Sequence, residues 1–251
     1  MILQQRSGPV VFAHRGASAH APENTLAAFR AAVDQKAQGV ELDAKLSSDG
    51  VVVVMHDQTV DRTTDGSGNV ASLTAIQLHR LDAGSHFSTD FAGEPVPTLE
   101  EVFNAVADKL LINIELTNYA SPLDELPAKV AQLVQQSGLS NRVIISSFHP
   151  MNLMRFHKLL PTVPLGLLAL PGKAGRWARS WMGRLFPQDA LHPFWGDVDA
   201  RLVNRCHQRG KQVNVWTVNK KEELCRLLDL KVDGIISDDP LMVRQIVKVD
   251  Y

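Results

Sequence analysis

The amino-acid sequence predicts an α/β protein in which residues 1–251 form a single (β/α)8 barrel, the TIM-barrel fold. Short apolar runs typical of buried strands alternate with amphipathic runs typical of helices, which is the order of elements in a mostly parallel sheet. A length of 251 residues is ordinary for one such barrel. The strand count agrees, because eight of the predicted strands can run parallel.

Nine segments are predicted as strands, since they are short and apolar. They are Val10–Ala13, Val40–Leu46, Val51–Met55, Leu110–Glu115, Val143–Ser146, Val163–Leu168, the weaker Ala190–His192, Gln212–Trp216 and Gly234–Ser237. The turn at Ser48, Asp49 and Gly50 is too short to join parallel strands, which need a crossover of roughly a dozen residues. Val51–Met55 is therefore the antiparallel hairpin partner of the preceding strand, and eight strands remain for the barrel.

Helices are predicted where apolar residues recur at three- and four-residue spacing. They are Thr25–Lys36, Leu99–Ala107, Leu126–Gln136, Pro150–Leu160, Ala200–Arg209, Lys221–Leu228 and Leu241–Lys248. Either Asn24 or Thr25 can cap the first helix. All but the last of these helices lie between two strands predicted to run parallel, as a crossover connection requires, and the last follows the final strand.

One departure from this alternation follows the hairpin. Residues 57–97 are rich in turn residues and contain one predicted helix, Thr74–Leu81, without a strong strand. We interpret this segment as a small insertion in the barrel.

A second departure is residues 171–187, which carry four cations and no acid. Trp177, Trp181 and Leu185 recur at the spacing of one helix face, which predicts a short amphipathic helix packed over the barrel. Contact with an anionic membrane through this segment is the alternative interpretation.

The composition excludes several classes of protein. Hydrophobic residues make up 45% and charged residues 21% of the chain, as in ordinary soluble globular proteins. The net charge of −1 offers no overall basic field for nucleic acid. No apolar run is long enough to span a membrane, and residues 1–6 do not resemble a signal peptide. Cys206 and Cys225 match no metal spacing and predict no disulfide, so a cytoplasmic location is expected.

Polar side chains gather at or near the ends of the predicted strands, where parallel barrels carry their active sites. His14 and Arg15 follow the first strand, and His56 follows the hairpin strand. Glu41 and Asp43 share one face of a strand because side chains alternate along it. Asn113 and Glu115 share a face at the end of a later strand, and Trp216 ends another. A barrel would bring all of these to one pocket.

These residue types indicate metal-assisted cleavage of a phosphodiester. The carboxylates of Glu41, Asp43 and Glu115 offer only oxygen ligands, which suit one Mg²⁺ or Ca²⁺ ion better than Zn²⁺. His14 and His56 can remove one proton and deliver another near neutral pH. The neighbouring guanidinium of Arg15 suits a phosphate group.

The chain resembles the glycerophosphodiester phosphodiesterase family, of the bacterial cytoplasmic type, in an ordered set of motifs that covers nearly its whole length. The motifs are His14-Arg15-Gly16-Ala17, Ala21-Pro22-Glu23-Asn24-Thr25, Glu41-Leu42-Asp43, Asp49-Gly50, His56-Asp57, Asp61-Arg62-Thr63-Thr64, Asn113-Ile114-Glu115, Ser146-Ser147-Phe148, Trp216-Thr217-Val218-Asn219 and Asp233-Gly234-Ile235-Ile236-Ser237-Asp238. Each motif alone is weak, but the ordered set is specific.

The resemblance implies a TIM barrel that hydrolyses glycerophosphodiesters to glycerol 3-phosphate and an alcohol. By this match, His14 and His56 are the acid–base pair, and Glu41, Asp43 and Glu115 bind Mg²⁺ or Ca²⁺. Arg15 becomes a phosphate contact, and Trp216 is interpreted as a wall of the substrate pocket or a core residue. One position departs from the pattern, because the family often has a lysine two residues after the metal-binding glutamate, where this chain has Thr117.

Two other functions fit the same residues. One is a lysophospholipase D-type phosphodiesterase that admits an acyl chain, and the other is a non-catalytic barrel that binds phosphodiesters. The sequence leaves open the choice between Mg²⁺ and Ca²⁺, the preferred alcohol, which histidine is the acid, and whether water attacks directly or through a cyclic phosphate. It also leaves the oligomeric state open.

Overall fold

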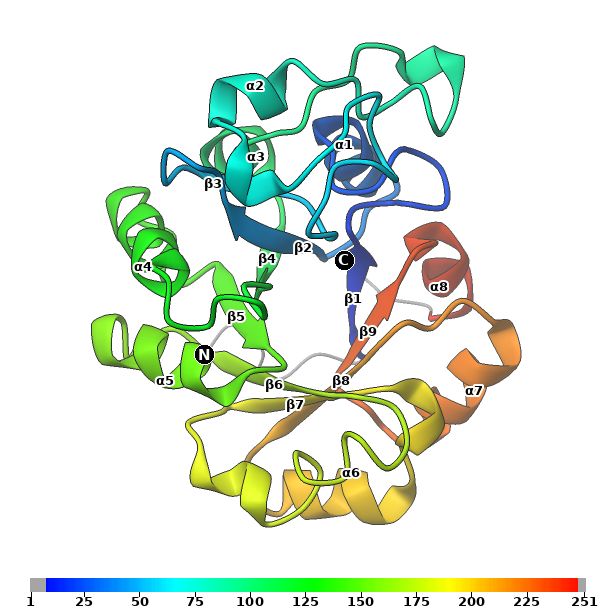
Figure 1. The fold of residues 1–251 in the computed structure, drawn as a ribbon. Coiled ribbons are helices and arrows are strands. Elements are labelled where there is room, and N and C mark those ends of the chain that lie inside the picture. Colours follow the sequence, from blue (N-terminus) through cyan, green and yellow to red (C-terminus); the bar gives the residue numbers. More distant parts are fainter. Residues whose placement is uncertain (1–7, 248–251) are drawn as a thin grey trace.

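Eight parallel strands close into a barrel in the computed structural model, which describes residues 8–247 (Figure 1). The strands are β1 Val10–His14, β2 Gly39–Leu46, β3 Val52–Val54, β4 Leu111–Leu116, β5 Val143–Ser147, β6 Leu165–Ala169, β7 Ala190–Pro193, β8 Gln212–Val215 and β9 Gly234–Ser237. Their order is β1-β9-β8-β7-β6-β5-β4-β2-β3, and pairing of β1 with β2 closes the ring. Because β3 pairs antiparallel with β2, it lies outside the ring of eight, and the predicted TIM barrel is confirmed.

The helices surround this ring (Figure 1). They are α1 Leu26–Asp34, α2 Ala75–His79, α3 Leu99–Val106, α4 Leu126–Gln136, α5 Pro150–Leu159, α6 Ala200–His207, α7 Lys221–Asp229 and α8 Pro240–Ile246. Each predicted helix between strands is present, with its ends moved by a few residues. The predicted end of the last helix, Lys248, lies outside the described residues. Thr25 is the N-cap of α1, where its side chain accepts from the backbone N–H of Ala28.

Side-chain alternation divides the strands into an outward and an inward set. Outward apolar residues of β1, β2 and β4 pack beneath the helices in the main core. Inside the ring, a second cluster forms an apolar floor. Its members are Val10, Phe12, Leu111, Ile144 and Ile236. The next inward positions along β1, β2 and β4 lie above this floor, toward the carboxyl ends of the strands, and they carry the polar residues singled out in the sequence.

Residues 57–97 cover one side of the barrel beside β3, as expected for an insertion (Figure 1). This segment contains no strand; it has α2, two short 3₁₀ helices and isolated bridges at Thr59–Asn69 and Asp82–Pro95. It also contributes to a small apolar cluster of its own with β3, whose members are Val53, Met55, Val60, Val70, Leu78, Ala83 and Val96. The assignment of the whole chain to one domain stays a prediction.

The helix predicted around Trp177, Trp181 and Leu185 is wrong. Residues 171–181 form turns, followed by a 3₁₀ helix at Met182–Leu185. Trp177 packs against the main core, whereas Trp181 and Leu185 are 63% and 70% exposed. The backbone folds closely on itself here: a Cβ at Gly175 would lie 1.9 Å from the backbone oxygen of Leu170, so this close approach depends on glycine.

The connection from β6 to β7 therefore lacks the α-helix found in the other crossovers. No helix among residues 8–247 has the length and apolar character needed to cross a bilayer.

Candidate active site

The register of three adjacent strands brings the predicted polar residues together. His14 of β1 is the register partner of Glu41 on β2, which is also the partner of Asn113 on β4. Asp43 is the register partner of Glu115. His14, Asn113 and Glu115 point into the barrel because each is an even number of positions from a floor residue on its strand. Glu41 and Asp43 share that direction because they are register partners of these inward residues.

Glu41, Asp43 and Glu115 form an acidic cluster in which one oxygen of each carboxylate lies within 4.8 Å of the others. Glu41 and Asp43 are buried, and Glu115 is half-buried. Burial, followed by the charge of Asp43, raises the pKa of Glu115 to about 8, and burial with the same neighbour raises the pKa of Glu41 well above its usual value. Three hard oxygen donors that repel one another this strongly fit a bound Mg²⁺ or Ca²⁺ ion, which would neutralise them.

The cluster has further polar neighbours. The hydroxyl of Tyr119 donates to Oε1 of Glu115 at 2.5 Å. Asn113 is buried beside the cluster, and its Oδ1 atom has no hydrogen-bond partner within residues 8–247. A buried amide oxygen without a partner is costly, so Oδ1 is available to a ligand in this pocket.

Arg15 lies on a strained turn that follows β1. Its φ is +56°, and the next residue, Gly16, has φ +84°. A Cβ at Gly16 would lie 2.6 Å from Cβ of Ala28, so the turn depends on glycine. The turn directs the backbone N–H of Arg15 to Oε2 of Glu41 at 3.2 Å and places Nε 3.3 Å from Oδ2 of Asp43.

His14 is held from behind by Asp238, which follows β9. Nδ1 of His14 lies 2.6 Å from Oδ1 of Asp238, and that oxygen also accepts from the hydroxyl of Ser18. Burial favours the neutral acid, but these hydrogen bonds and the charge of His14 lower the pKa of Asp238. An ionised carboxylate can only accept, so Nδ1 carries a proton, and Nε2 lies 3.9 Å from Oε2 of Glu41.

His56 is also held by an aspartate, but this one is its neighbour in the sequence. Its Nδ1 lies 2.6 Å from Oδ1 of Asp57, whose other oxygen accepts from Nε of Arg62 at 2.6 Å. Arg62, followed by His56, keeps the pKa of Asp57 low, at about 2. Arg62 also binds both oxygens of Glu23, which accepts from Arg15 as well. A chain of ion pairs thus joins the turn of Arg15 to the support of His56.

One cavity of about 110 Å³ collects these groups at the carboxyl ends of the strands. It is lined by His14, Arg15, Glu41, His56, Asn113, Glu115, Phe148, Leu168, Trp216, Thr217 and Ile236. Six of the seven residues predicted for the site line this cavity, and the seventh, Asp43, is buried in the acidic cluster at its edge. Trp216 is therefore a pocket wall, with Nε1 donating to the backbone oxygen of His192 and its ring edge-on to Phe148 at 5.5 Å.

The threonine at position 117, where the family often has lysine, binds the side chain of Lys45. Both are buried, and the Lys45 ammonium donates to Oγ1 of Thr117 at 2.9 Å and to its backbone oxygen at 3.1 Å. Burial lowers the pKa of Lys45, while Asp43 and Glu115 act in the opposite direction. A cation therefore does lie beside position 117, supplied by the neighbouring strand β2.

Several supporting residues were missed as site residues by the sequence. Asp238 follows a strand, so the rule that found His14 would also have found it. Arg62 and Tyr119 lie in loops, where no periodic signal exists.

Comparison with known proteins places this site in a family. The model of the glycerophosphoryl diester phosphodiesterase family matches residues 14–242. The chain belongs to this family. A glycerophosphodiester phosphodiesterase from Caldanaerobacter subterraneus is 41% identical over 232 residues, covering 92% of this chain and 94% of the relative. One from Bacillus altitudinis is 34% identical over 236 residues, with coverage of 92% and 94%.

Solved structures of phosphodiesterases share the fold. An Oleispira antarctica phosphodiesterase in complex with the product sn-glycerol-3-phosphate superposes with a TM-score of 0.84 and 28% identity, covering 96% of this chain and 97% of that one. The glycerophosphodiester phosphodiesterase of Agrobacterium tumefaciens gives a TM-score of 0.80 and 28% identity, with coverage of 94% and 99%. The predicted family and enzyme class are confirmed.

Proposed function

We propose that this glycerophosphodiester phosphodiesterase hydrolyses glycerophosphodiesters to glycerol 3-phosphate and an alcohol, with His14 and His56 as its acid–base pair. One observation carries the assignment of the histidines. Both line one cavity with the acidic cluster, and each has its Nδ1 held by an aspartate at 2.6 Å. That geometry leaves Nε2 of each ring for proton transfer.

Glu41, Asp43 and Glu115 would hold one divalent cation, Mg²⁺ or Ca²⁺. Their oxygen donors and close approach support this assignment. When bound, such an ion draws negative charge from a phosphoryl oxygen and orients the ester.

The histidines divide the proton transfers. One Nε2 removes a proton from the attacking hydroxyl or water, and the other delivers a proton to the departing alkoxide. Asp238 and Asp57 stabilise the imidazolium form of the histidine that each contacts, which the base reaches by taking up a proton and from which the acid starts. Replacing each histidine in turn and identifying the first product that accumulates distinguishes the acid from the base. The same experiment separates direct hydrolysis from a cyclic phosphate intermediate.

Arg15 and Trp216 would bind the substrate. The Arg15 guanidinium lies at the edge of the acidic cluster, where it can meet a phosphate oxygen that the carboxylates alone would repel. Trp216, Phe148, Leu168 and Ile236 give the cavity an apolar wall for the carbon atoms of the glycerol or the alcohol. The substrates proposed are compact head-group diesters, such as glycerophosphocholine or glycerophosphoethanolamine, in keeping with the matched family.

The test is release of glycerol 3-phosphate from glycerophosphocholine and glycerophosphoethanolamine in Mg²⁺, in Ca²⁺ and in EDTA. We expect release by the wild type with one of the metals, and a loss of at least about 100-fold in His14→Ala and in His56→Ala. His207→Ala is the matched control, because His207 also pairs with an aspartate, Asp233, yet lies outside the cavity. Greater turnover of the lysolipid counterparts would favour the lysophospholipase D alternative, and binding without turnover the non-catalytic barrel.

A further inference from the structure

The chain concentrates positive charge in one stretch. Residues 171–211 contain eight lysine and arginine residues against three acids, whereas the remainder of the chain contains 18 against 24. This stretch comprises most of the β6–β7 connection, which has no α-helix, followed by β7, α6 and the residues up to β8. A protein with a net charge of −1 therefore has one strongly basic side.

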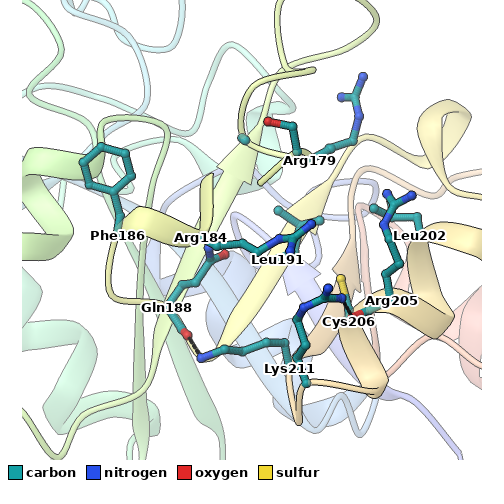
Figure 2. Close-up of a pocket in the computed structure, with 12 residues that line it drawn as sticks. Arg179, Arg184, Phe186, Gln188, Leu191, Leu202, Arg205, Cys206 and Lys211 are labelled. Carbon is teal, nitrogen blue, oxygen red and sulfur yellow. Dashed lines mark hydrogen bonds between the residues drawn. The ribbon is translucent and has the colours of Figure 1, made fainter. Parts of the chain in front are cut away.

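Five cations of this stretch line a cavity of about 120 Å³ between the β6–β7 connection and α6 (Figure 2). Together with Arg176 at a neighbouring hollow, they form what we call the basic flank. Its members are Arg176, Arg179, Arg184, Arg205, Arg209 and Lys211. The cavity itself has an apolar lining that includes Phe186, Leu191, Leu202 and Cys206.

Half of the basic flank is already used by the fold. Arg179 donates to the backbone oxygens of Leu170 and Gly172 and pairs with Asp197 at 3.0 Å. Arg209 donates to the backbone oxygen of Arg205, and Lys211 donates to that of Gln188, the contact drawn in Figure 2. These contacts fold the connection back on itself and join it to Asp197 and to Lys211, which follows α6.

The other half lacks partners. Among residues 8–247, the side chains of Arg176, Arg184 and Arg205 make no hydrogen bond or ion pair. The hollow that they line also contains Asp197, which pairs with Arg179, and Asp199, which caps α6. The cations of this hollow still outnumber its acids by four to two, which favours an anionic ligand.

Apolar side chains protrude beside these cations. Trp181, Met182 and Leu185 are all exposed, and they lie within one turn of Arg184 in sequence. Such protruding side chains have no role in the core and oppose solubility. Tryptophan and leucine next to arginine are the side chains that enter the interface of an anionic bilayer.

We propose that the basic flank, with Trp181, Met182 and Leu185, is a docking surface for an anionic phospholipid membrane. The unpaired guanidinium groups bind lipid phosphates, and the three apolar side chains enter the head-group region. The combination favours a bilayer over nucleic acid, since a polyanion without an apolar phase would leave the protruding side chains exposed.

The proposal is tested by co-sedimentation of the full chain with vesicles of phosphatidylcholine alone or mixed with phosphatidylglycerol. We expect binding to the mixed vesicles only, weakened by raised salt. Arg184→Gln/Arg205→Gln removes two unpaired cations and should lower the partition coefficient roughly thirtyfold. Trp181→Ala/Leu185→Ala should lower it about tenfold or more and abolish a blue shift of tryptophan emission on mixing.

Two control variants make the same kinds of substitution elsewhere on the surface, so that the effect of position can be told from the loss of charge or of apolar side chains. Arg30→Gln/Arg80→Gln removes two exposed arginines from α1 and the end of α2. Leu123→Ala/Ile76→Ala removes two apolar side chains that are 79% and 62% exposed elsewhere. Both controls should bind vesicles like the wild type.

Three outcomes would overturn the proposal. They are no vesicle binding by the wild type, equal losses in the control variants, or retention on duplex DNA with none on vesicles. Release of glycerol 3-phosphate from soluble substrate, without vesicles, should be unchanged in all four double variants. Failure of the docking proposal is thereby separated from failure of the proposed catalytic function, which the vesicle measurement does not involve.

Discussion

Nδ1 of His14 lies 2.6 Å from Oδ1 of Asp238, although 224 positions separate the two residues. The contact exists because β1, the first strand, pairs in parallel with β9, the last, and both residues leave the same edge of the barrel. Closure of the ring thus places the carboxylate that accepts from Nδ1 of His14 and leaves Nε2 facing the cavity. The same aspartate accepts from Ser18 and Asn219, which fixes its own orientation.

Asp238→Asn should leave the fold intact and lower kcat/KM by roughly 10²–10⁴. An amide can donate to Nδ1, which would shift the proton of His14 to Nε2 and remove the group that stabilises the imidazolium. The measurement is the pH profile of kcat/KM together with the melting temperature. Asp233→Asn, at the aspartate that pairs with His207 outside the cavity, is the control and should retain activity. An unchanged profile in Asp238→Asn would assign Asp238 to structure alone.

The strand-end positions could be predicted from the sequence because alternation and parallel order determine them. His14, Glu41, Asp43 and Glu115 each occupy an inward position near the carboxyl end of a strand, and a closed barrel has only one such edge. The hairpin of β2 and β3 could also be predicted, since a short turn cannot join parallel strands.

The loop residues of the site could not be predicted, because their contacts do not follow from the spacing of apolar residues along the sequence. Arg62 reaches Glu23 across 39 positions, along a loop path that the small apolar cluster of the insertion determines. The helix predicted around Trp181 failed for a related reason, because the spacing of apolar residues says nothing of backbone packing at Gly175 and Gly183. The spacing of apolar residues therefore predicts structure only where the backbone forms a regular helix or strand.

Gly16→Ala should unfold the turn that carries Arg15. The substitution combines a positive φ with a Cβ that would meet the backbone of Ala28 at 2.7 Å, and we expect a loss of about 2–4 kcal/mol in the free energy of unfolding. Urea denaturation measures this loss. Gly50→Ala is the control, because Gly50 has a similar φ of +75° and nothing within 4 Å of the added Cβ. Equal losses in both variants would show that backbone strain alone, without the contact to α1, sets the cost.

Thr117→Lys should be destabilising by about 2–4 kcal/mol, although the family often has lysine at this position. The second ammonium would replace the oxygen that accepts from Lys45 in a buried place and repel that cation. The double variant Lys45→Thr/Thr117→Lys exchanges the two groups and should recover most of the lost stability. Thermal denaturation of the wild type, the two single variants Lys45→Thr and Thr117→Lys, and the double variant measures the coupling. Additive losses in the double variant would exclude the exchange of roles between the two positions.

The metal-free enzyme should become less stable as the pH rises from about 5 to 8. Glu115 has a pKa of about 8 in the folded chain and an ordinary value of 4.5 when unfolded, and the pKa of Glu41 is raised as well. Between those values the folded state holds protons that the unfolded state has lost, so the free energy of unfolding falls with rising pH. Each pH unit with a difference of one proton costs about 1.4 kcal/mol, or roughly 3–6 °C in the melting temperature.

Melting curves in EDTA measure this decline, and saturating Mg²⁺ or Ca²⁺ should reverse it. A bound cation stabilises the ionised carboxylates, so the rise in melting temperature on adding metal should be larger at pH 8 than at pH 5. Glu115→Gln resembles the protonated side chain and should flatten the decline in EDTA while weakening the response to metal. Asp90→Asn, an exposed acid in the insertion, serves as the control. A melting temperature in EDTA that rises over this range would mean that the three carboxylates are ionised in the folded protein without a cation.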